Sequence, residues 1–80
     1  MNTQILTEMA EHYAQHVGLR TSTVGAYAVN DGKFFHRLAG GGGCTLKTAE
    51  RAVRYFSDHW PADLAWPRDI PRPPKSKEAA

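Results

Sequence analysis

Apolar side chains recur three or four residues apart in two long stretches of the chain. Between residues 3 and 17 they are Leu6, Met9, Ala10, Tyr13 and Val17. Between residues 45 and 60 they are Leu46, Ala49, Val53, Phe56 and Trp60. This spacing gives a helix one apolar face. We therefore predict a first and a last helix of a small bundle, the last one capped by Thr45 and stopped by Pro61.

Two shorter helices are predicted between the long ones. The first covers TSTVGAYAV, residues 21–29, with Thr21 or Ser22 as its N-cap. Gly25 lies inside it and costs about 1 kcal/mol relative to alanine, so we expect another helix to cross close by. The turn formers Asn30, Asp31 and Gly32 follow, and Asn30 or Asp31 is suited to cap the next helix.

The next predicted helix, KFFHRLA at residues 33–39, has two chemically distinct sides. At about 100° per residue, one side carries Phe34, Phe35, Leu38 and Ala39, and the other carries Lys33, His36 and Arg37. The first side is suited to a core and the second is cationic. The glycine run 40–43 ends this helix and forms a loop.

The C-terminal segment has a different composition. All five prolines occur from Pro61 onward, and the last residues are polar. We predict an extended or disordered tail at 61–80, outside a helical domain at 1–60. The fold class expected is therefore all-α, with four helices and a proline-rich tail.

Length and cysteine content narrow the cellular setting. Eighty residues allow one modest core, and the single Cys44 excludes an intrachain disulfide, which favours a reducing cytoplasm. The start of the chain has no cationic leader followed by an apolar stretch, and no run of about 18 apolar residues could span a bilayer. We expect a cytoplasmic protein that does not bind a membrane.

Positive charge is concentrated in one part of the chain. The formal net charge is only +2, but the segment from Lys33 to Arg54 holds five basic residues and the single acidic Glu50. The basic residues are Lys33, Arg37, Lys47, Arg51 and Arg54. Such a segment is suited to a polyanion, and a solvated basic surface is the alternative.

The cationic side of residues 33–39 is the candidate site for reading DNA bases. Lysine and arginine can donate to guanine, and histidine can donate or accept, so Lys33, His36 and Arg37 are the candidates. Backbone contacts are expected from flanking groups, because these fix register; they are Thr21, Ser22, Thr23, Tyr27, Asn30, Thr45 and Lys47. Each could equally be a cap or an unengaged surface residue. Phe34 is expected in the core, with a thymine-methyl contact as the alternative.

Other chemistries find little support in the sequence. GGGGCTLKT lacks the glycine before lysine and the preceding strand of a phosphate-binding loop. His12 and His16, with Glu8 one turn earlier, have a zinc-compatible spacing, but no further ligand is evident. No nucleophile with a base and an orienting group is recognisable. We therefore expect no cofactor, no metal, no small-molecule ligand and no enzymatic activity.

Residues 21–56, TSTVGAYAVNDGKFFHRLAGGGGCTLKTAERAVRYF, resemble the phage-repressor-like helix-turn-helix family, the lambda-repressor, Cro or XRE type. The matching features are Val24-Gly25, Phe35, a glycine at 40 or 41, and Thr45. The short alphaproteobacterial members are the most similar. The resemblance implies a bacterial transcriptional regulator, a repressor that binds double-stranded DNA as a homodimer and associates with the nucleoid. It also places groove contacts at Gly32, Lys33, His36 and Arg37.

The sequence departs from that family in two places. Val29, Asn30 and Asp31 stand where a turn glycine is usual, and the proline-rich end is no standard fifth helix. The alternative function is a non-enzymatic protein-interaction module, an antitoxin or adaptor, that uses the tail with Trp60, Trp66 and the prolines.

Overall fold

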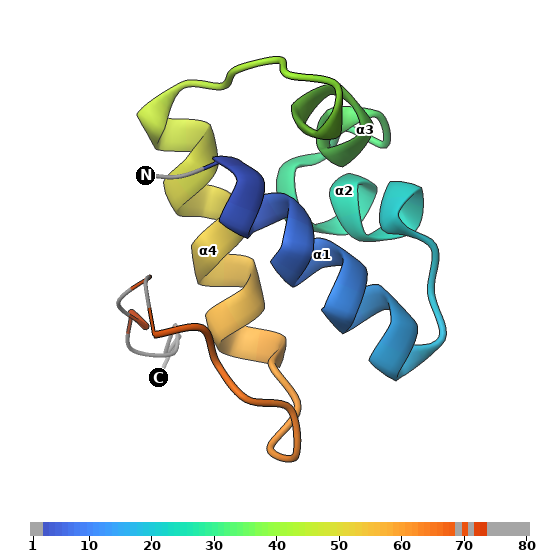
Figure 1. The fold of residues 1–80 in the computed structure, drawn as a ribbon, viewed down its shortest axis with the longest axis vertical. Helices are drawn as coiled ribbons and strands as arrows, with labels where there is room; N and C mark the ends of the chain where they lie inside the picture. The colour runs from blue at the N-terminus through green and yellow to red at the C-terminus, as the bar shows by residue number, and fades with distance from the viewer. Residues whose placement is uncertain (1–2, 69, 71, 74–80) are drawn as a thin grey trace.

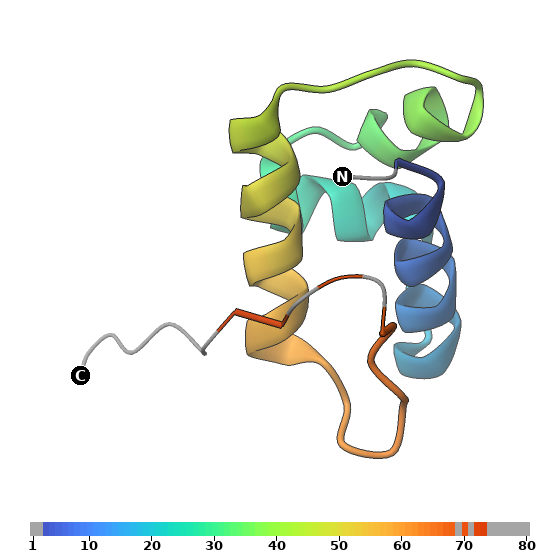
Figure 2. The ribbon, with the colours of Figure 1, turned by 60° about the vertical axis from the view of Figure 1, so that its left-hand side comes forward.

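The described part of the chain, residues 3–68, 70, 72 and 73 of the computed structural model, contains four α-helices and no strand. The helices are α1 (Thr3–Val17), α2 (Thr21–Val29), α3 (Phe34–Ala39) and α4 (Leu46–His59). In Figure 2, α1 and α4 run along two sides of the molecule, with α2 between them and α3 above. The predicted all-α class is thus confirmed for these residues.

Most of the predicted apolar positions form one core. Each helix contributes to it, and Leu6, Val24 and Phe56 are fully buried. Aromatic rings fill its centre, where Phe35 reaches Phe56 with ring centroids 5.9 Å apart and Tyr13 stacks on Trp60 at 5.9 Å. Such pairs add to the stability that burial itself provides.

A few predicted core positions lie at the surface instead. Val17 is 41% exposed and Leu46 is 65% exposed, and Ala39 is exposed as well. Ala14 and Ala52 are buried in their stead. Val17 and Leu46 are terminal residues of their helices, where the neighbouring helices no longer cover the apolar face.

Helix boundaries agree with the sequence to within one residue, but the predicted cap of α2 was wrong. Thr45 caps α4 as expected, since its Oγ1 accepts the Thr48 N–H at 3.1 Å. At the start of α2, however, Arg20 occupies the N-cap position and no side chain caps the helix. Thr21 and Ser22 lie inside the first turn.

The segment after α4 packs against the bundle, which corrects the prediction of a separate tail for its described residues. It turns below the bundle and returns toward α1 and α4 (Figures 1 and 2). Ile70 is buried, 4% exposed, and Trp60 is buried with it. The segment forms no helix, but its apolar residues complete the core. The part of the predicted tail at 74–80 lies outside the described residues.

Indole hydrogen bonds hold this segment in place. Trp60 Nε1 donates to the Leu64 carbonyl at 2.7 Å, and Trp66 Nε1 donates to the Ile70 carbonyl at 2.7 Å. The Ser57 hydroxyl of α4, fully buried, donates to the Pro73 carbonyl. A buried polar group requires such a partner, so α4 and the segment satisfy each other's polar atoms.

Candidate nucleic-acid interface

The turn between α2 and α3 is closed by backbone hydrogen bonds. Asn30 ends α2 in the left-handed conformation, with φ 58°, which asparagine tolerates better than most residues. Its N–H and that of Asp31 donate to the Ala26 and Gly25 carbonyls at 3.1 and 3.2 Å. Asn30 thus takes the role that a glycine would have in this turn.

Gly25 is required by this turn. A Cβ at position 25 would come within 2.6 Å of the Asp31 carbonyl oxygen and 3.6 Å of Phe35 Cδ2. The sequence predicts a close neighbour here, and the structure identifies it as the turn backbone rather than a crossing helix.

Asp31 organises the start of α3. Its Oδ1 accepts the Lys33 N–H at 3.0 Å, and its carbonyl accepts the Phe34 N–H at 3.1 Å. Lys33 itself stands at the N-cap position. The prediction that Asn30 or Asp31 caps this helix is therefore wrong, because Lys33 is the N-cap and no side chain caps the helix; the Asp31 carboxylate binds the N–H of the N-cap residue itself.

The two sides of α3 differ as predicted. Phe34, Phe35 and Leu38 are no more than 5% exposed, so Phe34 belongs to the core. Lys33, His36 and Arg37 are all exposed. A six-residue helix is too short to be stable alone; its three buried side chains therefore hold the cationic side outward.

Arg37 is not free in this arrangement. Its Nη2 lies 2.7 Å from Asp31 Oδ2. The hydrogen bond from Arg37 lowers the pKa of Asp31, and the Lys33 backbone N–H lowers it further. The pair joins the turn to the middle of α3 and fixes the direction of the guanidinium group.

Part of the predicted backbone-contacting set lies next to α3. A Cβ at Gly32 would be 3.5 Å from the Ser22 carbonyl oxygen, so the turn touches the first turn of α2. Thr21 and His36 line one cavity of about 140 Å³ together with Glu11 of α1. The structure thereby groups Thr21 and Ser22 with Gly32 and His36, and it adds a carboxylate to that group.

The rest of the set lies elsewhere. Tyr27 of α2 is 62% exposed and makes the smallest contribution to the raised pKa of Tyr55 on α4, which is due first to burial and then to Tyr13. Thr45 lines a cavity with Thr3 at the start of α1, and Lys47 lies in the first turn of α4. Thr23 lies on α2 and is half-buried. Asn30 ends α2 and is exposed.

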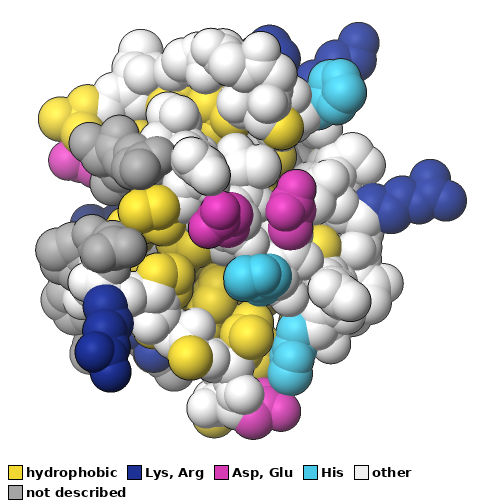
Figure 3. Space-filling model, viewed as in Figure 1, with side chains coloured by type: hydrophobic (Ala, Val, Ile, Leu, Met, Phe, Trp, Pro, Cys, Tyr) yellow, Lys and Arg dark blue, Asp and Glu magenta, His cyan; other side chains and the backbone are white. Residues whose placement is uncertain are grey.

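The face over α1 has the opposite charge to the candidate interface. In Figure 3, acidic and histidine side chains lie in the middle of this face, whereas lysine and arginine side chains lie at its edges, together with further acidic and histidine side chains. The carboxylates over α1 make the middle of this face unsuited to a polyanion.

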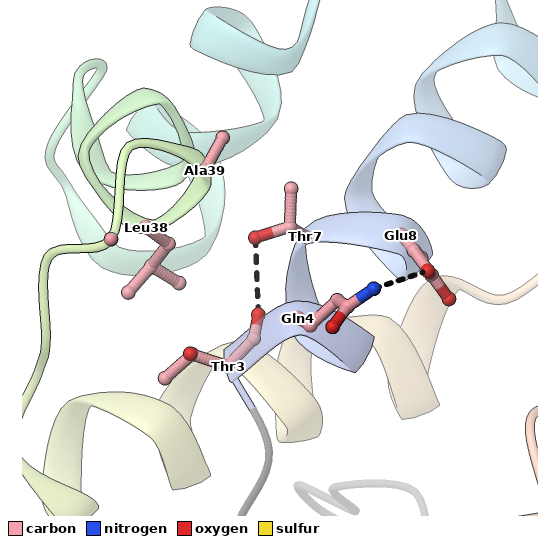
Figure 4. Close-up of a pocket in the computed structure, with 7 residues that line it drawn as sticks. Thr3, Gln4, Thr7, Glu8, Leu38 and Ala39 are labelled. Carbon is pink, nitrogen blue, oxygen red and sulfur yellow. Dashed lines mark hydrogen bonds between the residues drawn. The ribbon is translucent and has the colours of Figure 1, made fainter.

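A shallow cavity of about 400 Å³ lies between the start of α1 and the end of α3. Figure 4 shows Thr3, Gln4, Thr7 and Glu8 on the α1 side and Leu38 and Ala39 on the α3 side. The Thr7 hydroxyl donates to the Thr3 carbonyl at 3.0 Å, and Gln4 Nε2 lies 3.5 Å from Glu8 Oε2. These polar groups are engaged within α1, and the one charged residue in the lining is an acid.

Among the described residues, no three histidine, cysteine, aspartate or glutamate side chains gather where they could hold a metal ion. Instead, Nε2 of His16 lies 3.0 Å from Oδ1 of Asp63 in the C-terminal segment. No helix in the described ranges is long and apolar enough to cross a membrane.

Sequence reasoning missed the Asp31 pair with Arg37 and the docking of the C-terminal segment. The two residues of the pair are six positions apart, a spacing that no single helix brings together, and the pair forms because a turn separates them. Trp66 and Ile70 could have indicated the packing of the C-terminal segment, because large apolar residues in a polar segment are stabilised by burial.

Comparisons with protein-family models, with curated proteins and with solved structures find no match to this chain.

Proposed function

We propose that the chain is a sequence-specific, double-stranded DNA-binding regulator in which α2 and α3 form a helix-turn-helix and α3 enters the major groove. The observation that carries the proposal is the division of α3, with three buried apolar residues on one side and Lys33, His36 and Arg37 on the other. A reading helix needs a supported inner face and polar side chains that reach base edges.

The neighbourhood of α3 supports this role. The first turn of α2, with Thr21 and Ser22, lies beside Gly32 at the start of the cationic side. Hydroxyl and backbone N–H groups there can bind phosphates while Lys33, His36 and Arg37 reach bases. Asp31 would direct Arg37, as an acceptor that holds a guanidinium group in one orientation.

The regulatory class that we propose is that of a repressor. A repressor acts by occupying its operator, and two copies reading half-sites about one turn of DNA apart would supply the usual symmetry. The structure offers the alternative interaction module less support, since Trp60 is buried and Trp66 is half-buried.

The test begins with selection of bound sequences from a random duplex pool by the full chain. An enriched motif is expected, and an inverted repeat would show binding as a dimer. Arg37→Ala should then weaken binding to the enriched duplex by about 1–3 kcal/mol, roughly 5- to 150-fold, with little effect on a scrambled duplex.

Arg68→Ala is the matched control, because Arg68 is an exposed arginine of the C-terminal segment and its loss changes the net charge equally. Unchanged affinity of Arg37→Ala for the enriched duplex, or the absence of any enriched motif, would refute base reading by α3.

A further inference from the structure

A second cationic surface lies on α4, away from α3. Lys47, Arg51 and Arg54 are exposed and stand at i, i+4 and i+7, so they share one side of the helix. We call these three residues the α4 ridge. The opposite side of α4, with Ala49, Val53 and Phe56, is buried.

Arg37 on α3 is paired with Asp31, whereas the arginines of the ridge have no ion-pair partner among the described residues. Within the described ranges, no carboxylate lies at ion-pair distance from Lys47, Arg51 or Arg54, and none of their side chains makes a hydrogen bond. Glu50 lies between Lys47 and Arg51 in the sequence of the same helix. The three charges are therefore available to a ligand.

The position of the ridge separates it from α3. Backbone contacts join α4 to α1 and α2, whereas α3 packs on α1 and α2. In Figure 2, α4 forms one side of the molecule and α3 lies toward the other. A side of α4 that points away from the core thus faces away from α3 as well.

Tyrosines extend the ridge toward α2. Tyr55 follows Arg51 by four residues on α4, so the two side chains are neighbours on the helix surface. Tyr55 is half-buried, and its ring centroid lies 6.1 Å from that of Tyr13. The exposed Tyr27 belongs to α2, which packs against α4. An exposed tyrosine on a helix packed against a cationic one offers a hydroxyl donor for phosphate and an aromatic ring for a base or sugar.

The length of the ridge suits a nucleic-acid strand. Seven residues of helix separate Lys47 from Arg54, a rise of about 10 Å. Phosphates of one DNA strand rise by about 3.4 Å each along the duplex axis, so a ridge laid parallel to that axis spans the rise of about three of them.

We infer that the α4 ridge, together with Tyr27, is a phosphate-backbone binding site for duplex DNA, separate from α3 and indifferent to base sequence. It requires no base reading by α3, so either proposal can fail without the other.

The experiment measures binding of the full chain to a fluorescent duplex of arbitrary sequence, as a function of salt. Arg51→Gln with Arg54→Gln should weaken binding more than tenfold at low salt. It should also reduce the slope of log K against log salt by about 2, since each phosphate contact contributes about 0.9. Tyr27→Phe should give a smaller loss than Tyr27→Ala if both hydroxyl and ring take part.

Two comparisons distinguish binding at the α4 ridge from a general effect of net charge and from base reading by α3. Arg51→Gln should weaken binding clearly more than Arg68→Gln, which removes the same charge elsewhere. Lys33→Gln with Arg37→Gln should abolish preference for an enriched sequence, whereas the double α4 variant keeps it. Circular dichroism verifies that each variant is folded.

Equal losses for Arg51→Gln and Arg68→Gln would overturn the inference, because the effect would then be one of net charge. Unchanged duplex binding by the double α4 variant would also overturn it. Binding of anionic lipid vesicles that depends on Arg51 and Arg54, without an effect on duplex binding, would assign the ridge to a membrane surface instead.

Discussion

The helices α3 and α4 both present cations to solvent, but they are held in different ways. The six-residue α3 has no side-chain cap and depends on Phe34, Phe35 and Leu38. The fourteen-residue α4 has the Thr45 cap, a longer buried side and the C-terminal segment bound to Ser57. Local sequence therefore supports α4, whereas tertiary contacts create α3. Substitutions in the two helices should differ in both size and kind of effect.

The largest effect is expected from Phe35→Ala. Phe35 is 2% exposed and contacts the rings of Phe34 and Phe56 at 4.9 and 5.9 Å. Its loss leaves a cavity and should lower the free energy of unfolding by about 3–5 kcal/mol, measured by urea denaturation. Phe35→Leu should recover much of this loss; equal destabilisation by both variants would contradict a volume effect.

A smaller effect is expected from Thr45→Ala, which removes the cap of α4. The Thr45 hydroxyl accepts the Thr48 N–H at 3.1 Å, and loss of such a cap costs about 1 kcal/mol. Thr45→Ser keeps the acceptor and serves as the control. Because its buried side and the C-terminal segment also stabilise α4, this helix should remain folded at low temperature in Thr45→Ala. A loss of fold by Thr45→Ala would show that α4 depends on its first turn.

The smallest effect is expected from Asp31→Asn, and it depends on pH. The hydrogen bond from Arg37 lowers the pKa of Asp31 in the folded chain. Its contribution to stability is present above the ordinary pKa of an aspartate and is lost as the pH falls through the lowered value. Denaturation at several acidic pH values should show this loss in the native sequence and not in Asp31→Asn.

The same variant also sharpens the functional comparison. Without the carboxylate, Arg37 should bind duplex DNA of any sequence more tightly, and the preference for an enriched sequence should fall. Asp63→Asn, on the C-terminal segment and exposed, is the matched control for the removed negative charge. A gain of sequence preference in Asp31→Asn would mean that Asp31 does not direct Arg37.

The sequence predicts the helices well because their signals are local. The apolar spacing of α1 and α4, the Thr45 cap and the two-sided pattern of α3 depend only on neighbouring residues. The arrangement of charges is less predictable, because it depends on turn geometry, as Asp31 and Arg37 show. Likewise, the sequence groups Lys47 with the cationic side of α3, whereas in the structure Lys47 is on α4, which makes no backbone contact with α3.

The C-terminal segment shows the limit of composition as a guide. Proline content excludes a helix there, and the structure has none in the described residues. It does not exclude docking, because Trp66 and Ile70 can bind to the core from an irregular backbone. The apolar residues of the segment account for its packing on the core, and its prolines account for its irregular backbone.

The glycine loop between α3 and α4 has a consequence for the unfolded chain. Gly41 has φ +96°, and a Cβ at Gly42 would come within 2.9 Å of the Arg37 carbonyl oxygen, so the folded loop requires both. Consecutive glycines also widen the range of conformations open to the chain before it folds, and folding must remove that freedom. The connection that allows α3 to end so abruptly thus adds conformational entropy to the unfolded state, and it lowers the stability of the fold without breaking any native contact.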